Sequence, residues 1–309
     1  MNSQKVLDLR GKNLTSFPIS VVDLIALEEL ELDENQLASL PEGIGRLTHL
    51  IKLSLYSNRL TSLPETLWTL SNLRTLNLSE NHLSFLSEGI GNLTDLSMLD
   101  LGHNEFASLP KSIGNLLSLT FLYLSNNHLT ALPGSFEHLD SLIYLNITDN
   151  RLDSLPESIG KLSRLIELRL YNNSLSSLPG SLGDLIQLKE MHLMNNKLES
   201  LPDTIGNLSH LKKLSLQGNQ LASLPESLGN LTNLTDLDLR ANQLTSLPET
   251  LGDLRSLRYL DLRANKLDGL PTSFEKLVNL EKLDLRWNRL ASLPAWIGRI
   301  EQRGCTVFV

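Results

Sequence analysis

Seven histidines and several groups of acidic residues are the side chains of this chain that could do chemistry. His192 follows Glu190 by two residues and His103 follows Asp100 by three, so either pair could exchange a proton with a substrate. Both pairs fall on a surface that we expect to be open to water, where nothing would exclude solvent from the reaction. The chain also has no phosphate-binding loop and no HExxH, CxxC or GxSxG motif. We therefore predict a protein that is not an enzyme and uses no cofactor.

An acidic cluster near the N-terminus raises the question of a metal site. Ca²⁺ prefers clustered carboxylates, but it also needs a loop that makes them converge on one point. The sequence gives no sign of such a loop, and Arg10, Lys52 and Arg59 are expected beside the cluster. We predict a solvated acidic patch that could steer a basic partner, rather than a metal site. The cluster consists of Glu28, Glu29, Glu31, Asp33 and Glu34.

A 23-residue spacing organises nearly the whole chain. Asn recurs every 23 residues from Asn35 to Asn288, and all twelve prolines lie on a second phase of the same period, broken only by Ser87. Residues 234–256, "LTDLDLRANQLTSLPETLGDLRS", show the unit. Its alternating "LDL" predicts a strand, and Pro248 stands where a short helix or 3-10 turn would begin. One unit cannot bury its own leucines, so we expect the units to stack around a continuous core.

The pattern LxxLxLxxNxLxxLPxxIGxLxx resembles the leucine-rich-repeat family. It is similar to the 23-residue form found in bacterial cytoplasmic or effector proteins and in Ras-group scaffolds of plants and animals. The resemblance covers about thirteen repeats. It implies an α/β fold, a right-handed solenoid or horseshoe with a concave parallel β-sheet and short helical or 3-10 turns on the convex side. It also implies binding of a protein partner, with small GTPases and other signalling proteins as candidates.

The recurring asparagines and the chain ends belong to this architecture. A buried carboxamide can donate and accept at once, so we predict that the asparagines bond turn backbone and bind no ligand. We predict one domain, residues 1–309, with atypical end repeats at 1–22 and 296–309. In the C-terminal "GCTVFV" the repeat phase places Thr306 and Phe308 inward. Hydrophobicity instead favours Cys305, Val307 and Val309, and the sequence leaves both registers open.

Charge and cysteine content limit the partners and the compartment. The net charge of −8 lacks the basic footprint that nucleic acids and anionic membrane surfaces require. One cysteine, no visible signal peptide and no long apolar run favour the cytoplasm, with secretion of an effector without a classical signal peptide as the alternative. A regulatory or sensory segment of a larger kinase or GTPase is a further alternative for the function.

The side chains expected on the outward face of the strands form three zones. Repeat 2 is acidic, repeats 11 to 13 are almost entirely charged, and repeats 4 to 7 carry Asp100 as the one charge among their twelve outward positions. All five tyrosines fall on outward phases. Exposed aromatic and Met side chains are typical of binding hot spots, although aromatic residues also suit strands. We predict partner binding by Met98, Phe121, Tyr123, Tyr144, Arg169, Tyr171, His192 and Met194.

The motif "LDLR" recurs three times near the C-terminus. Stacking would align its Asp and Arg residues in two parallel columns of opposite charge, which neutralise each other. The alternative is a secondary docking strip, because Arg binds carboxylates well. This strip would consist of Asp238, Arg240, Asp261, Arg263, Asp284, Arg286 and Trp287. On the opposite side of the repeat, Trp68 replaces the usual Gly and is predicted to be an exposed hydrophobic residue.

Overall fold

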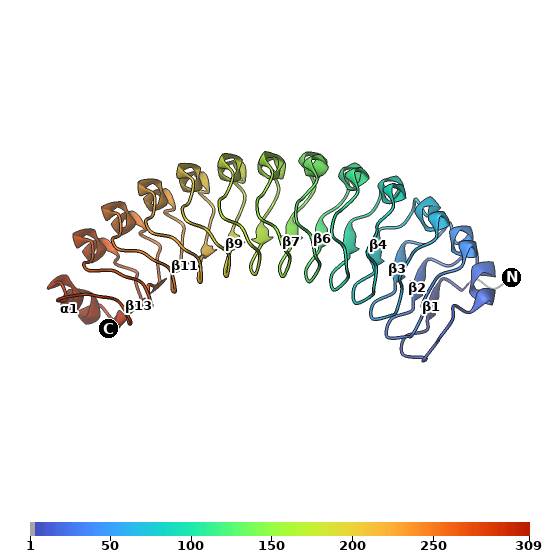
Figure 1. The fold of residues 1–309 in the computed structure, drawn as a ribbon, viewed down its shortest axis with the longest axis horizontal. Helices are drawn as coiled ribbons and strands as arrows, with labels where there is room; N and C mark the ends of the chain where they lie inside the picture. Colours follow the sequence, from blue (N-terminus) through green and yellow to red (C-terminus); the bar gives the residue numbers. More distant parts are fainter. Residues whose placement is uncertain (1–3) are drawn as a thin grey trace. The chain divides into compact units, whose positions relative to one another are not determined.

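The computed structural model describes residues 4–309 (Figure 1). They divide into two compact units, the first ending at Arg151 and the second beginning at Leu152. Both units repeat the same elements: a three-residue strand, a turn, and in most repeats a five-residue 3-10 helix (η). No helix within residues 4–309 is long and apolar enough to cross a membrane. That residues 1–309 form a single domain stays a prediction.

The first unit contains seven strands and six 3-10 helices, and β1 comes first in the chain. Its strands are β1 (Val6–Asp8), β2 (Glu29–Glu31), β3 (Lys52–Ser54), β4 (Thr75–Asn77), β5 (Met98–Asp100), β6 (Phe121–Tyr123) and β7 (Tyr144–Asn146). Its helices are η1 (Ile19–Asp23), η2 (Glu42–Arg46), η3 (Glu65–Thr69), η4 (Glu88–Asn92), η5 (Lys111–Asn115) and η6 (Gly134–His138).

The second unit continues the pattern and closes with an α-helix and a last strand. Its strands are β8 (Glu167–Arg169), β9 (Glu190–His192), β10 (Lys213–Ser215), β11 (Asp236–Asp238), β12 (Tyr259–Asp261), β13 (Lys282–Asp284) and β14 (Thr306–Phe308). Its helices are η7 (Glu157–Lys161), η8 (Gly180–Asp184), η9 (Asp203–Asn207), η10 (Glu226–Asn230), η11 (Glu249–Asp253), η12 (Thr272–Lys276) and α1 (Trp296–Gln302).

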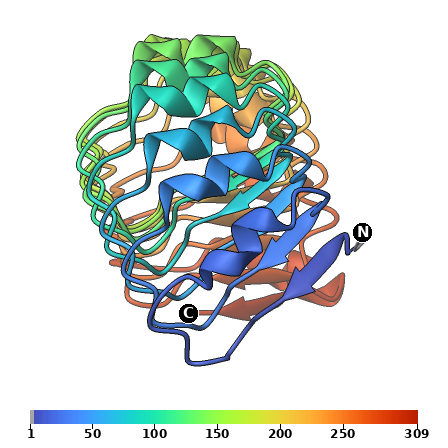
Figure 2. The ribbon, with the colours of Figure 1, turned by 90° about the vertical axis from the view of Figure 1, so that its right-hand side faces the viewer.

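Within each unit, neighbouring strands pair in parallel and in chain order. Leu30 pairs with Leu53 in the first unit and Leu214 with Leu237 in the second, so the register follows the 23-residue period. These leucines are almost fully buried between the strands and the 3-10 helices. In the first unit the helices stack on one side and the strands on the other (Figure 2). The predicted leucine-rich-repeat solenoid of about thirteen repeats with a parallel sheet is confirmed.

The proline phase marks the start of the 3-10 helices. Pro248 is the N-cap residue of η11, in an extended conformation that proline adopts easily, and the helix begins at the next residue. Where Ser87 replaces proline, its hydroxyl accepts a hydrogen bond from the Gly89 N–H at 3.1 Å. Serine therefore starts η4 by side-chain capping, in a repeat where proline does not supply the conformation.

The asparagines form the predicted buried ladder. Asn58 donates from Nδ2 to the carbonyl of Leu32, 26 residues earlier, at 2.9 Å. Its Oδ1 accepts the N–H of Leu37, 21 residues earlier, at 3.0 Å. Asn242 repeats these contacts in the second unit, with Leu216 and Leu221. Each asparagine thus satisfies backbone groups of the preceding repeat, which confirms their structural role.

The residue before each ladder asparagine adopts a left-handed backbone conformation. His103, with φ of 52°, and Trp287, with φ of 62°, are two examples, and Gly218 is the one glycine at this position among residues 4–309. Side chains with a β-carbon lose about 1–2 kcal/mol in this conformation. The turn directs these side chains to solvent, and both His103 and Trp287 are exposed.

The helical side of the stack relies on close contact between small residues. A β-carbon on Gly160 of η7 would lie 2.3 Å from the carbonyl oxygen of Ser181 in η8, so only glycine fits there. Trp68 occupies the same position in η3, and the prediction that it is exposed was wrong. Its side chain is 3% exposed, because the facing residue of η4 is Gly89, which leaves room for the indole ring.

The C-terminal segment resolves the register that the sequence left open. Thr306 pairs with Lys282 and Val307 with Leu283, an offset of 24 residues instead of 23. Helix α1, whose Trp296 ring lies 5.9 Å from that of Phe274, adds the extra residue. The repeat-phase register was therefore wrong, and Thr306 and Phe308 point outward. Hydrophobicity was right for Cys305 and Val307, while Val309 is 67% exposed.

Candidate functional site

Four of the eight predicted binding residues form a patch on the outward face of the first unit. Strand register places Met98, Phe121 and Tyr144 side by side in one column of β5, β6 and β7. Tyr123 lies in the adjacent column, with its ring centroid 5.1 Å from that of Tyr144. Phe121 is 40% exposed, and the other three are partly exposed. We call Met98, Phe121, Tyr123 and Tyr144 the aromatic patch.

The carboxylate of Asp100, next to the aromatic patch, is directed at the turn that follows its own strand. Its carboxylate accepts the N–H of Gly102 at 2.9 Å, and Asn146 accepts that of Thr148 in the same way two strands later. Burial raises the pKa of Asp100, and the Gly102 hydrogen bond opposes that shift. Tyr123 takes the equivalent position in β6 and places an aromatic ring there. The patch is thus apolar and aromatic at a position that elsewhere caps a turn.

Two carboxylates of the acidic cluster of repeat 2 form ion pairs, with the predicted Lys52 and with Lys5, which was not predicted, while Arg10 pairs with Asp8. Lys52 Nζ lies 2.5 Å from Glu31, and Lys5 Nζ lies 2.6 Å from Glu28. Asp33 accepts hydrogen bonds from the Ser54 hydroxyl and from the Tyr56 N–H. These contacts face different neighbours, so the carboxylates do not converge in the way a calcium ion requires.

The other four predicted residues lie on the second unit. Arg169 of β8 pairs in register with His192 of β9, and Tyr171 and Met194 follow these strands in the adjacent turns. The Asn172 N–H donates to the Met194 carbonyl at 2.9 Å, which holds the two turns together. All four side chains are partly exposed. Arg169 also forms an ion pair with Glu167 of its own strand at 2.5 Å.

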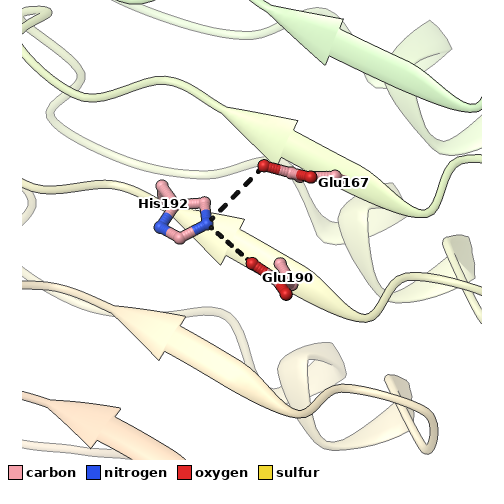
Figure 3. A group of neighbouring side chains, drawn as sticks. All are labelled: Glu167, Glu190 and His192. Atoms are coloured by element: carbon pink, nitrogen blue, oxygen red, sulfur yellow. Dashed lines mark hydrogen bonds and ion pairs between the residues drawn. The ribbon is translucent and has the colours of Figure 1, made fainter.

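His192 lies between two carboxylates (Figure 3). Its Nε2 is 3.3 Å from Oε2 of Glu190 and 4.0 Å from Oε1 of Glu167 on the neighbouring strand. Burial opposes ionisation of Glu190, but Lys213 and His192 outweigh it and hold its pKa below the ordinary value. The His192–Glu190 contact suggested by sequence therefore exists. In the other pair, His103 instead contacts Asn126, and Asp100 contacts Gly102.

The predicted Asp and Arg columns form a continuous ladder. Arg263 Nη2 lies 2.6 Å from Asp261 of its own strand, and its Nε lies 3.4 Å from Asp284 of the next strand. The Asp284 side chain is fully buried, and although burial opposes ionisation, Arg286 lowers its pKa. Mutual neutralisation accounts for these contacts. Trp287 at the end of the ladder is 71% exposed, with the Arg286 guanidinium 5.6 Å from its ring centroid.

Part of the ladder surface is hollow. A depression of about 470 Å³ lies over β10 to β13, and Lys213, Tyr259, Asp261 and Lys282 are among its lining residues. Tyr259 is 40% exposed and donates from its hydroxyl to Glu281 at 2.8 Å. Charged and aromatic groups therefore meet in this depression, which lies where the sequence predicts the secondary docking strip.

Sequence reasoning missed two features of this surface. Glu167 was not among the predicted binding residues, although its position 23 residues before Glu190 was enough to place the two carboxylates side by side. The turn-capping role of the outward Asp and Asn residues was also missed. Its signal was an Asp or Asn two residues before the turn in several repeats, such as Asp238, which accepts the Arg240 N–H.

Comparisons with known proteins agree with this architecture. A model of a leucine-rich repeat region matches residues 62–143, 111–201 and 135–243, and a leucine rich repeat model matches residues 25–83 and 232–290. A leucine-rich-repeat protein of Leptospira interrogans is 37% identical, with a TM-score of 0.88, over 96% of this chain and 76% of its own. No curated protein sequence matches the chain significantly.

Two further solved structures are complexes. The plant peptide hormone receptor RGFR1, in complex with RGF2, is 30% identical over 99% of this chain and 55% of its own, with a TM-score of 0.76. The structure of the Toll–Spätzle complex of Drosophila gives 25% identity over 96% of this chain and 46% of its own, with a TM-score of 0.78. This chain thus spans about half the length of these two chains. With family models matching more than half of its residues, the chain belongs to the leucine-rich-repeat family.

Proposed function

We propose that this chain is a non-catalytic interaction module that binds a protein partner through the outward face of its strands. The observation that carries the proposal is the aromatic patch, in which Phe121 is 40% exposed between Met98 and Tyr144. These outward aromatic side chains are not part of the core, whose positions are filled mainly by leucine. Such side chains supply a large apolar contact area at low entropy cost when a partner covers them.

The family supports this proposal at a coarser level. Leucine-rich-repeat proteins generally bind other proteins, and two of the similar structures are complexes of Toll with Spätzle and of RGFR1 with RGF2. The second unit offers a further set of partly exposed residues: Arg169, Tyr171, His192 and Met194. We assign the Asp and Arg ladder with Trp287 a secondary docking role, because its ion pairs already neutralise most of its charge.

The experiment that tests the proposal is affinity purification with a patch variant. The tagged wild-type chain and the Phe121→Ala/Tyr123→Ala variant are used to capture proteins from cells, and the captured proteins are identified by mass spectrometry. Truncating two central hot-spot residues is expected to cost about 2–4 kcal/mol, which lowers the affinity at least thirtyfold. The partner should therefore be lost from the variant sample.

A matched control is available within the same unit. Phe85 is 74% exposed but lies outside the strands, so Phe85→Ala removes an exposed aromatic ring without touching the patch. This control should capture the same proteins as the wild-type chain. Equal capture by the folded patch variant would place the partner elsewhere, and Tyr171→Ala/Met194→Ala would then test the second unit.

The compartment and the partner class are also part of the proposal. We propose a cytoplasmic location, in which small GTPases and other signalling proteins are the first partners to test. The similarity to a Leptospira interrogans protein makes a secreted bacterial effector the variant of this proposal to test next. Localisation of a tagged chain and assays of delivery into host cells separate the two.

A further inference from the structure

Two neighbouring strands of the second unit bring three metal-binding side chains together. Glu167 of β8 pairs in register with Glu190 of β9, and His192 lies two residues further along β9 on the same face. One potential ligand atom from each residue lies within 4.8 Å of the other two. The side chains are 18–31% exposed, so the cluster is partly shielded but can be reached from solvent.

The distances in this cluster suit a small transition-metal ion. Zn²⁺ binds His nitrogen and carboxylate oxygen at about 2.0–2.2 Å, so tetrahedral ligand atoms lie roughly 3.3–3.6 Å apart. His192 Nε2 already lies 3.3 Å from Oε2 of Glu190 and 4.0 Å from Oε1 of Glu167. From this geometry we propose that Glu167, Glu190 and His192 bind one divalent transition-metal ion, with Zn²⁺ as the test ion.

The type of ligand selects the class of metal. One imidazole with two carboxylates suits Zn²⁺ and its neighbours, whereas Ca²⁺ takes six to eight oxygen ligands and Mg²⁺ requires octahedral oxygen coordination. Figure 3 shows the three side chains together on two neighbouring strands. Three protein ligands would leave further coordination positions of the ion open. Either water or a carboxylate or imidazole group of another molecule would fill these positions.

Two neighbouring basic side chains, Lys213 and Arg169, orient the carboxylates and influence the affinity of the site for the metal ion. Lys213 Nζ lies 3.2 Å from Oε1 of Glu190, which leaves Oε2 directed at His192. Arg169 Nε contacts Oε1 of Glu167 at 2.5 Å, and the same oxygen faces His192, so the ion would use another lone pair of Oε1. Hydrogen bonds of this kind fix carboxylate ligands in place. Because they also offset the negative charge, we expect them to weaken the attraction of the carboxylates for the ion.

The test uses the full chain with Zn²⁺ alone in a calorimetric titration at neutral pH. We expect one ion bound per chain, and a loss of at least tenfold in affinity for both His192→Gln and Glu190→Gln. Cys305 is buried, which shields its thiol from the added ion. Ca²⁺ in place of Zn²⁺ should give no measurable binding.

The chain supplies a matched control. His82 Nδ1 lies 3.5 Å from Glu105, an exposed pair in the first unit that lacks the geometry of the three-residue cluster. His82→Gln should leave the Zn²⁺ affinity unchanged. The proposal is overturned if His192→Gln and Glu190→Gln, shown to be folded by circular dichroism, bind Zn²⁺ as tightly as the wild-type chain. It is also overturned if His82→Gln weakens binding as much as they do.

Discussion

Trp68 lies against Gly89 of the next repeat. In most other repeats the first of these two positions holds the smaller residue and the second holds the larger one, so the order of sizes is reversed here. A β-carbon on Gly89 would lie 2.3 Å from Cδ1 of the indole ring. Elsewhere the small residue comes first, as where Gly160 faces Ser181. Val22 and Gly43 show the same exchange on a smaller scale, at 3.1 Å. The exchange lets a large aromatic residue join the core, where Trp68 is 3% exposed.

This pair predicts strong coupling between two substitutions. Gly89→Ser forces a side chain into the indole ring and should cost about 1–3 kcal/mol of unfolding free energy. Trp68→Gly leaves a large cavity and should cost about 3–5 kcal/mol. The double variant restores the small pair found in other repeats, so it should be more stable than the sum of the two losses. Urea unfolding of the four proteins measures this difference, and simple additivity would contradict the proposed contact.

The close contacts of the helical side predict opposite effects for two neighbouring glycines. In Gly160→Ala the new methyl group meets the Ser181 carbonyl at 2.3 Å, and backbone must shift, at about 1–3 kcal/mol. In Gly180→Ala no heavy atom lies within 4 Å, and loss of backbone freedom in the unfolded chain should stabilise by about 0.4–1 kcal/mol. Thermal unfolding compares the two. A lower midpoint for Gly180→Ala than for Gly160→Ala would contradict this packing.

The asparagine ladder predicts that an isosteric substitution is destabilising. Asn242 donates to the carbonyls of Leu216 and Leu239 at 3.0 Å each, and aspartate in its place has no N–H to donate. Asn242→Asp should cost about 3 kcal/mol or more at neutral pH, because a buried charge then faces two carbonyl oxygens. The exposed Asn207 provides the control, and Asn207→Asp should stay within about 0.5 kcal/mol. Equal urea midpoints for the two variants would refute the ladder.

Glutamates that bond the next 3-10 helix predict a loss of stability in acid. Glu249 accepts the N–H of Ser273 at 2.9 Å and that of Thr272 at 3.1 Å, and these bonds lower its pKa from the ordinary 4.5. The pKa values of Glu88 and Glu157 are lowered in the same way, by Ser112 and Ser181. A lowered folded-state pKa stabilises the protein above about pH 4.5, and this contribution disappears as the pH falls through the lowered value.

The measurement is the unfolding midpoint of Glu249→Gln and of the wild-type chain between pH 7 and pH 3. The variant should be the less stable protein at pH 7, and the difference should shrink as the wild-type carboxylate is protonated. Glu199→Gln, at an exposed loop position, serves as the control and should follow the wild-type curve. A gap between Glu249→Gln and wild type that stays constant down to pH 3 would argue against this capping role.

Sequence predicted the fold well because one period controls the register of the strands within each unit, apart from β14. The phases of Asn58 and Pro248 alone place strands, turns and 3-10 helices correctly. One prediction failed, and one register stayed open, where a residue depends on a neighbour outside its own phase. The burial of Trp68 depends on Gly89 in the next repeat, and the register of Phe308 depends on helix α1, which adds one residue.

The candidate site was predictable in its positions and less so in its contacts. Phases placed Phe121 and Tyr144 on the outward face, and both are exposed or partly exposed there. The phases did not reveal that Asp100 is turned into a hydrogen bond with Gly102, or that Glu167 joins His192. These contacts depend on side-chain rotamers and on neighbouring strands together, which a repeat pattern does not specify. That the eight predicted residues bind a partner stays a prediction.

The asparagine ladder has a direction, and this has a consequence for how the chain folds as it leaves the ribosome. Asn58 serves Leu32 and Leu37 of the repeat before it, and Asn242 does the same for Leu216 and Leu221. Synthesis proceeds from the N-terminus, so the newest repeat always has turn groups that lack their partner. Its completion must wait for the next asparagine, and co-translational folding should trail synthesis by about one repeat of 23 residues.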